Sequence, residues 1–234
     1  LFRSIISGAG LPTELPKFAE GYDVALAPIV SSTKSANVIL KFWDKKYHRT
    51  ADFLVIEGPL AGGHLGFSRE QLEDIPGLDY DTEIRNIITL KQTYEEKYQT
   101  AIPVFVAGGM FTAEDVKHVL ELGADGIQAA TRFVATEECD ASDAYKQAYV
   151  NASEEDVIII KSPVGMPGRA IKNAFIQRML AAPDKISHCF NCLKACNPVT
   201  APYCITQALI NAVVGDLDNG LIGEVTSFDI CANR

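Results

Sequence analysis

The feature that most constrains the fold of this chain is a two-segment unit that repeats along residues 1–130. A short apolar segment ends at Gly, Ser or Pro, and an amphipathic segment with helical spacing follows it. The apolar segments predict strands at Phe2–Ser7, Asp23–Ile29, Asp52–Ile56, Pro103–Ala107 and Gly126–Ala130. The amphipathic segments predict helices at Leu15–Glu20, Lys34–Lys46, Thr82–Thr100 and Ala113–Leu122. Alternating strands and helices predict an α/β fold with a parallel sheet covered by helices.

The number of units bears on the architecture. Five units are visible, whereas a (β/α)8 barrel has eight, and a doubly wound sheet of about five or six strands would be nearly complete. Because the chain opens in the middle of the pattern, we expect a partial TIM barrel made of its last five βα units.

The pattern stops after Thr131. We expect a helix at Arg132–Gln147, a strand at Asp156–Lys161, a rigid loop at Ser162–Gly168, a helix at Arg169–Ala181 and a helix from about Ile205 to Val214. No linker or low-complexity segment interrupts the chain. We therefore predict one domain over residues 1–234, with barrel units in 1–135 and a helical, Cys-rich elaboration in 136–234.

Composition restricts the classes of partner. Hydrophobic residues make up 47% of the chain and charged residues 22%, which is enough apolar material for a buried core. A formal net charge of −9 argues against a nucleic-acid or membrane-surface partner, because both favour basic patches. No apolar run reaches the roughly 18 residues that cross a bilayer. Four of the six cysteines crowd into residues 189–204, unlike a secreted disulfide framework, so we predict a cytoplasmic protein.

Unusual residues follow each predicted strand. They are Gly8–Gly10, Ser31–Ser32, Glu57–Gly66, Gly108–Gly109 and Thr131–Arg132. Because the carboxyl ends of parallel strands meet at one edge of a sheet, we expect these loops to share the face where α/β proteins bind ligands.

The loop Glu57–Gly66 combines an acid, four glycines and a histidine. Glycines permit positive φ and close approach to the backbone, and imidazole titrates near neutral pH. The loop therefore predicts a site in which His64 lies over a flat or phosphorylated ligand. The alternative is a flexible turn that carries a surface histidine.

Two further loops have phosphate-binding chemistry. Gly108 and Gly109 lie between a strand and a helix, and Gln128, Ala129, Ala130 and Thr131 end the next strand. Exposed backbone amides at such places bind phosphate, although a Gly-Gly pair also occurs in simple turns. There is no G-x-G-x-x-G or Walker sequence, so a Rossmann or P-loop nucleotide site is not indicated.

The cysteine cluster has the composition of a thiolate metal site. Its members are Cys189, Cys192, Cys196 and Cys204. Four thiolates suit zinc or an iron–sulfur cluster, and the alternative is a set of partly buried free thiols. Cys139 and Cys231 are interpreted as ordinary small residues.

Three motifs in this order resemble the nitronate monooxygenase family, formerly called 2-nitropropane dioxygenase, which includes flavin-dependent enoyl-ACP reductases. The motifs are Ala61-Gly-Gly-His64-Leu-Gly66, Val106-Ala-Gly-Gly-Met110 and Ala130-Thr-Arg-Phe133. The resemblance runs from Arg3 to about Leu221 and lacks the N-terminal strands of the family. Some bacterial members also carry the sequence Ser162-Pro-Val-Gly-Met-Pro-Gly-Arg169 and a C-terminal cysteine cluster.

The resemblance implies a TIM barrel that binds FMN. It implies that the flavin phosphate is held by Gly108, Gly109, Gln128, Ala129, Ala130 and Thr131. It also implies that Ala61, Gly62 and Gly63 lie along the flavin, that Glu57 hydrogen-bonds to it, and that His64 is the catalytic residue facing the substrate.

The activity implied by the resemblance is FMN-dependent oxidation of alkyl nitronates by O2 to a carbonyl compound and nitrite. One alternative is an NAD(P)H-dependent flavin reductase of enoyl thioesters or quinones. From a different class, the chain could be a non-catalytic barrel fragment whose cysteines bind a metal.

Overall fold

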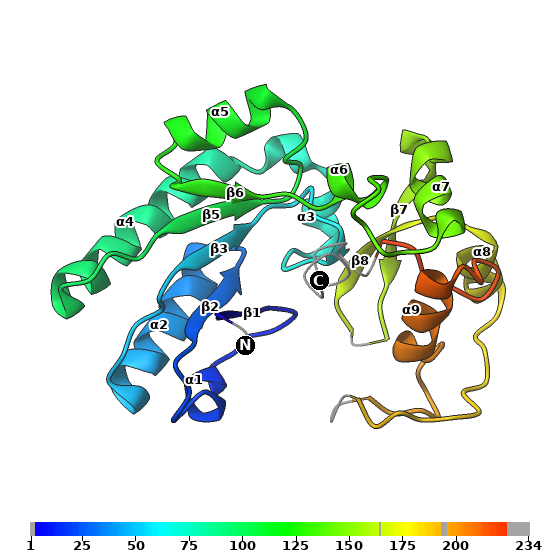
Figure 1. Ribbon diagram of the computed structural model, residues 1–234, viewed down its shortest axis with the longest axis horizontal. Helices are drawn as coiled ribbons and strands as arrows, with labels where there is room; N and C mark the ends of the chain where they lie inside the picture. Colours follow the sequence, from blue (N-terminus) through cyan, green and yellow to red (C-terminus); the bar gives the residue numbers. More distant parts are fainter. Residues whose placement is uncertain (1–2, 164, 193–195, 224–234) are drawn as a thin grey trace. The chain divides into compact units, whose positions relative to one another are not determined.

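The computed structural model describes residues 3–163, 165–192 and 196–223 (Figure 1). The chain divides into two compact units, which we describe separately. The sheet unit comprises Leu1–Ala61 and Gly66–Ala129, and the C-terminal unit comprises Gly62–Leu65 and Ala130–Arg234. The single domain over residues 1–234, with a junction at residue 135, stays a prediction.

The sheet unit is built on a five-stranded parallel sheet with the order β1-β2-β3-β5-β6. Its strands are β1 (Ser4–Ser7), β2 (Ala25–Val30), β3 (Leu54–Glu57), β5 (Val104–Ala107) and β6 (Gly126–Gln128). All five lie where the sequence places them, so the prediction of an α/β fold with a parallel sheet is confirmed. In the described residues β1 and β6 are the edges of this sheet, and the closed eight-unit barrel stays a prediction.

Helices follow the strands as predicted. They are α1 (Leu15–Phe18), α2 (Thr33–Tyr47), α4 (Tyr80–Tyr98) and α5 (Ala113–Glu121). The short helix α3 (Arg69–Glu73) and the 3-10 turn η1 (Ile75–Gly77) were not predicted. The start of α2 is fixed by a capping box in which the side chains of Ser32 and Ser35 each accept a hydrogen bond from the other residue's backbone N–H.

One face of the sheet packs against the long helices, which Figure 1 shows along one side of the strands. The buried cluster includes Leu54 and Ile56 from β3 together with Ile39 from α2 and Ile87 from α4. Because side chains alternate along a strand, Val55 and Glu57 point to the opposite face. The carboxyl end of β3 therefore directs an acid away from the helix-covered core.

The C-terminal unit contains a three-stranded antiparallel sheet with the order β4-β8-β7. The strands are β4 (Gly63–His64), β7 (Val157–Lys161) and β8 (Pro167–Ile171). Its helices are α6 (Thr131–Val134), α7 (Asp143–Asn151), the 3-10 turn η2 (Glu154–Asp156), α8 (Ala174–Ala181) and α9 (Ile205–Val214). The predicted strand at Asp156–Lys161 and the predicted helix at Ile205–Val214 are confirmed.

Two predictions for this unit are wrong. The single helix expected at Arg132–Gln147 is broken, because Ser142 accepts a hydrogen bond from the Tyr145 N–H and starts α7 afresh. The helix expected from Arg169 starts late, because Pro167–Ile171 forms β8, which pairs with β7 along its whole length and also takes the last two residues of the expected loop Ser162–Gly168. Helix α8 begins only after Asn173, whose side chain caps it through the Ile176 N–H.

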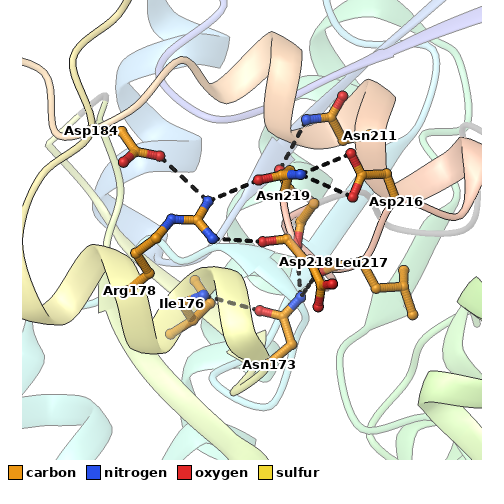
Figure 2. A network of polar contacts seen from close by, with 10 residues as sticks. Asn173, Ile176, Arg178, Asp184, Asn211, Asp216, Leu217, Asp218 and Asn219 are labelled. Atoms are coloured by element: carbon orange, nitrogen blue, oxygen red, sulfur yellow. Dashed lines mark hydrogen bonds and ion pairs between the residues drawn. The ribbon is translucent and has the colours of Figure 1, made fainter.

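A network of polar contacts fastens α8 to the segment after α9 (Figure 2). The Arg178 guanidinium donates to the Asp218 carbonyl at 2.8 Å and to Asn219 Oδ1 at 3.1 Å, and it lies 3.4 Å from Asp184. The Asn173 amide donates to the Leu217 carbonyl at 2.8 Å. These bonds satisfy carbonyls of a loop that has few backbone partners of its own, so the network is structural.

Among the described residues, no helix has the length and hydropathy of a membrane span.

Candidate functional site

The carboxyl end of the parallel sheet carries a row of three side chains. Glu57 on β3 is in register with Ala107 on β5, and Ala107 is in register with Gln128 on β6. Partners in register point to the same face, and neighbouring strands lie about 4.8 Å apart. Glu57 and Gln128, both predicted as cofactor-binding residues, therefore flank Ala107 on the face away from the helices, about 10 Å from one another.

Glu57 has an unusual electrostatic setting. Burial raises the pKa of its carboxyl to about 7. Its backbone is fixed, because the Tyr80 hydroxyl donates to the Glu57 carbonyl at 2.9 Å and the Gly58 N–H donates to the Ala107 carbonyl at 2.8 Å. Burial, followed by the nearby charge of Glu57, raises the pKa of Tyr80, so this hydroxyl stays a hydrogen-bond donor. Near neutral pH a substantial fraction of the Glu57 carboxyl is protonated.

Gly108 and Gly109 pack against the loop that follows β3. Their φ angles are 90° and 79°, which disfavours any residue with a side chain. A Cβ on Gly108 would lie 2.9 Å from the Ala61 nitrogen, and one on Gly109 would lie 3.0 Å from a Leu60 methyl. The structure thus brings the predicted residues Ala61, Gly108 and Gly109 together. Close packing of the two loops is therefore one reason for glycine at positions 108 and 109, beside the predicted binding of a ligand.

The last predicted phosphate-binding residues span the two units. Gln128 ends β6, and Ala129 is the last residue of the sheet unit. Ala130 precedes α6, and Thr131 is the first residue of this four-residue helix in the C-terminal unit. Their contact with a flavin stays a prediction.

His64 lies in a defined strand rather than in a flexible turn. Gly63 and His64 pair with Arg169 and Gly168 of β8, with Gly63 at a φ of 71°. His64 Nε2 lies 2.7 Å from Oγ of Ser162, a side chain that is only 2% exposed. Burial lowers the pKa of His64, which keeps the imidazole neutral at neutral pH. The alternative of a surface histidine on a flexible turn is wrong.

Ser162, which contacts His64, and Arg169, at the other end of the same turn, are residues to which the sequence assigned no role. Ser162 follows β7, and Arg169 on β8 is in register with Gly63. Alternation places Arg169 on the opposite face of the small sheet from His64, and burial lowers the pKa of its guanidinium. The sequence feature that could have indicated these two residues is the motif Ser162-Pro-Val-Gly-Met-Pro-Gly-Arg169, because its turn brings both ends of the motif beside β4.

The four clustered cysteines line a common cavity of about 100 Å³ in the C-terminal unit. Cys189 and Cys192 are exposed, whereas Cys196 and Cys204 are partly buried. Burial, with a smaller contribution from the neighbouring thiols, raises the pKa of Cys196. Within residues 3–163, 165–192 and 196–223, no three His, Cys, Asp or Glu side chains are grouped to hold a metal ion. The zinc or iron–sulfur prediction therefore has no support in the described residues.

The sequence predicts that the two remaining cysteines, Cys139 and Cys231, are ordinary small residues. Cys139 is buried in a cluster with Tyr145 and Ala212, as expected for an ordinary small core residue. Cys231 lies outside the described residues.

Comparison with known proteins adds named relatives to this geometry. The probable nitronate monooxygenase of Staphylococcus saprophyticus is 32% identical over 135 residues, which are 58% of this chain and 36% of the relative. The probable nitronate monooxygenase of Staphylococcus aureus strain Newman is 30% identical over 128 residues, 55% of this chain and 34% of the relative. The chain thus spans about a third of the length of these relatives.

Solved structures share the fold. FabK from Thermotoga maritima matches with a TM-score of 0.65 at 25% identity, over 97% of this chain and 62% of that one. Nitroalkane oxidase from Streptomyces ansochromogenes matches with a TM-score of 0.60 at 21% identity, over 98% of this chain and 63% of that one. The family model for nitronate monooxygenase matches residues 3–231. The chain belongs to the nitronate monooxygenase family.

Proposed function

We propose that this chain binds FMN and oxidises alkyl nitronates to a carbonyl compound and nitrite, with O2 as the second substrate. Family membership supports a flavin oxidoreductase, and one structural neighbour is named as a nitroalkane oxidase. The single observation that carries the proposal is His64, held neutral by burial and fixed by a 2.7 Å contact with Ser162 in the motif that the family resemblance makes catalytic.

The sheet unit fits a planar, phosphorylated cofactor. The loops after β3 and β5 contain Gly58, Gly108 and Gly109, whose backbone amides have no side chain of their own to screen them from a ligand. Gly108, Gly109, Gln128, Ala129, Ala130 and Thr131 are the proposed phosphate contacts, and Ala61, Gly62 and Gly63 are the proposed ring contacts. When bound, the flavin supplies the redox chemistry that no side chain of this chain provides.

His64 has two proposed roles toward the substrate. A neutral imidazole can accept the carbon-bound proton of a nitroalkane, and its N–H can hydrogen-bond to the nitro oxygens of a nitronate. Ser162 serves both roles by fixing the ring. When Nε2–H donates to Ser162 Oγ, Nδ1 carries the lone pair, and the reverse tautomer makes Nδ1 a donor.

A second candidate function follows from the same site. NAD(P)H-dependent reduction of an enoyl thioester or quinone needs the same flavin and a proton donor near the acceptor, a part that His64 can take. The family that the chain resembles includes flavin-dependent enoyl-ACP reductases, and this supports the reductase as a second candidate. The third candidate, a non-catalytic metal-binding fragment, has no grouped ligands in the described part of the chain.

A visible spectrum of the purified chain with stoichiometric FMN separates these candidates. Ethylnitronate and then NADPH are added without oxygen. Bleaching of bound flavin by ethylnitronate alone, with nitrite formed once O2 is admitted, supports the oxidase. Bleaching by NADPH alone supports the reductase. An absence of FMN binding contradicts both functions for this chain.

A further inference from the structure

The Glu57 carboxyl is a partly buried titratable group for which the described residues provide no hydrogen-bond or ion-pair partner. No hydrogen bond or ion pair of its side chain occurs within the described residues, although its backbone is bonded to Tyr80. Carboxyl groups removed from water are normally paired with a cation or with hydrogen-bond donors. An unpaired one at the ligand-binding end of a parallel sheet suggests that its partner is a ligand.

The surroundings of Glu57 favour a protonated carboxyl. Its neighbour in register is Ala107, and the next side chain in the row is the neutral amide of Gln128. From α4 the titratable groups are Tyr80, which remains protonated, and Glu83, which accepts a hydrogen bond from the Thr33 N–H. Neither Tyr80 nor Glu83 carries a positive charge that would stabilise a carboxylate at Glu57.

We propose that Glu57 binds the cofactor in its protonated form, donating a hydrogen bond to a carbonyl oxygen or ring nitrogen of the isoalloxazine, so that flavin binding is coupled to the uptake or retention of one proton. This inference rests on the proposed binding of FMN. It adds a chemical requirement, which is that the ligand presents an acceptor to Glu57, and it makes the site sensitive to pH.

The sign of the coupling follows from proton linkage. Below neutral pH the carboxyl already carries its proton and binding needs no uptake. Above neutral pH, the free protein must take up a proton at Glu57 in order to bind FMN. The affinity for FMN therefore falls by up to about tenfold per pH unit, until the pH reaches the pKa of Glu57 in the complex. A carboxylate that accepted a flavin N–H instead would give the opposite slope.

The test is FMN affinity as a function of pH, measured by quenching of flavin fluorescence from pH 5.5 to 8.5 at constant ionic strength. For the unmodified chain, we expect the Kd to rise about tenfold between pH 7 and 8.5. Glu57→Gln keeps a donor of the same shape at every pH, so its affinity should not fall above pH 7. Glu57→Ala should bind weakly throughout, and the exposed control Glu114→Gln should reproduce the slope of the unmodified chain.

Two results would overturn the inference. One is an affinity that does not fall above pH 7, and the other is an equal slope in Glu57→Gln. If FMN fails to bind at any pH, the proposed function itself fails. The protonation state is then decided by the carboxyl ¹³C shift of Glu57, assigned by its loss in Glu57→Gln, where a midpoint near 7 supports a protonated carboxyl and a midpoint near 4.5 contradicts it.

Discussion

The imidazole Nε2 of His64 lies 2.7 Å from the hydroxyl Oγ of Ser162, although 98 positions separate the two residues along the chain. The contact exists because β8 pairs with β4 on one side and with β7 on the other. Ser162 follows β7 directly, so the hairpin carries its hydroxyl to the histidine. A residue that the sequence left without a role thus holds the residue proposed as catalytic.

Ser162→Ala should lower turnover and leave FMN affinity unchanged. The serine is buried, and its removal takes away the hydrogen bond at Nε2 that helps to set the orientation of the ring. A hydrogen bond of this kind contributes about 1–1.5 kcal/mol, which corresponds to roughly a tenfold loss of kcat. Nitrite formation from ethylnitronate measures kcat, and the exposed Ser187→Ala is the control. An unchanged kcat would show that Ser162 does not position His64.

His64→Ala should retain flavin and lose turnover by about 10²–10⁴, the range for loss of a general acid–base group. The pH profile of the unmodified chain provides an independent check. Because burial lowers the pKa of His64, the neutral base persists below pH 6.5. With a neutral nitroalkane as substrate and FMN kept saturating at every pH, kcat/KM should therefore decline only on the acid side of 6.5. A decline centred above 6.5 would assign the base to another group.

The parallel sheet could be read from the sequence because its signals are local. Short apolar runs such as Leu54–Ile56 alternate with long helical periods, and Ser32 marks the start of α2. Placement of Glu57 and Gln128 at the carboxyl ends of strands also required only the rule that such ends share an edge of the sheet, and the register shows that they share a row. Periodicity thus predicted the sheet unit to within two residues at its described strand ends.

The C-terminal unit was predicted less well because its order depends on contacts between distant residues. Pro167–Ile171 has little apolar alternation of its own and becomes a strand by pairing with β7 and β4. The two-residue strand at His64 exists only through that pairing. No local pattern could reveal that Ser162 would meet His64, and the spacing of Cys189, Cys192, Cys196 and Cys204 overstated how closely these thiols are grouped.

Glu57→Gln should stabilise the folded chain at alkaline pH. The folded pKa of about 7 exceeds the ordinary value of 4.5, so ionisation costs stability. The contribution of the protonated carboxyl is fully present below pH 4.5 and is lost as pH rises through 7. The free energy of unfolding of Glu57→Gln should therefore exceed that of the unmodified chain by an amount that grows as the pH rises from 4.5 through 7. At 1.36 kcal/mol per pKa unit, this excess reaches at most about 3 kcal/mol.

Urea unfolding of both proteins at pH 4.5, 6 and 8 measures this difference. Glu114→Gln, which replaces an exposed carboxyl of the same unit, should show no such trend. A constant difference between Glu57→Gln and the unmodified chain across the three pH values would mean that Glu57 titrates alike in the folded and unfolded states.

Gly108→Ala should weaken both folding and FMN binding, and a matched variant can separate its two causes. Gly108 has a φ of 90°, and a Cβ there would lie 2.9 Å from the Ala61 nitrogen and 3.0 Å from the Gly58 carbonyl oxygen. Gly21 in the same unit has a φ of 81° with nothing within 4 Å of its added Cβ. Gly21→Ala therefore imposes the backbone strain alone, of order 1–3 kcal/mol.

The excess loss of stability in Gly108→Ala over Gly21→Ala reports the collision with the loop that follows β3. Because that loop carries Ala61, displacing it should also raise the Kd for FMN, whereas Gly21→Ala should bind FMN normally after correction for the folded fraction. Urea midpoints and fluorescence titrations of the two variants supply both numbers. Equal losses of stability in the two variants, together with unchanged FMN affinity, would mean that Gly108 is needed for its backbone conformation alone. The packing of the loop after β5 against the loop after β3 would then play no part in binding the cofactor.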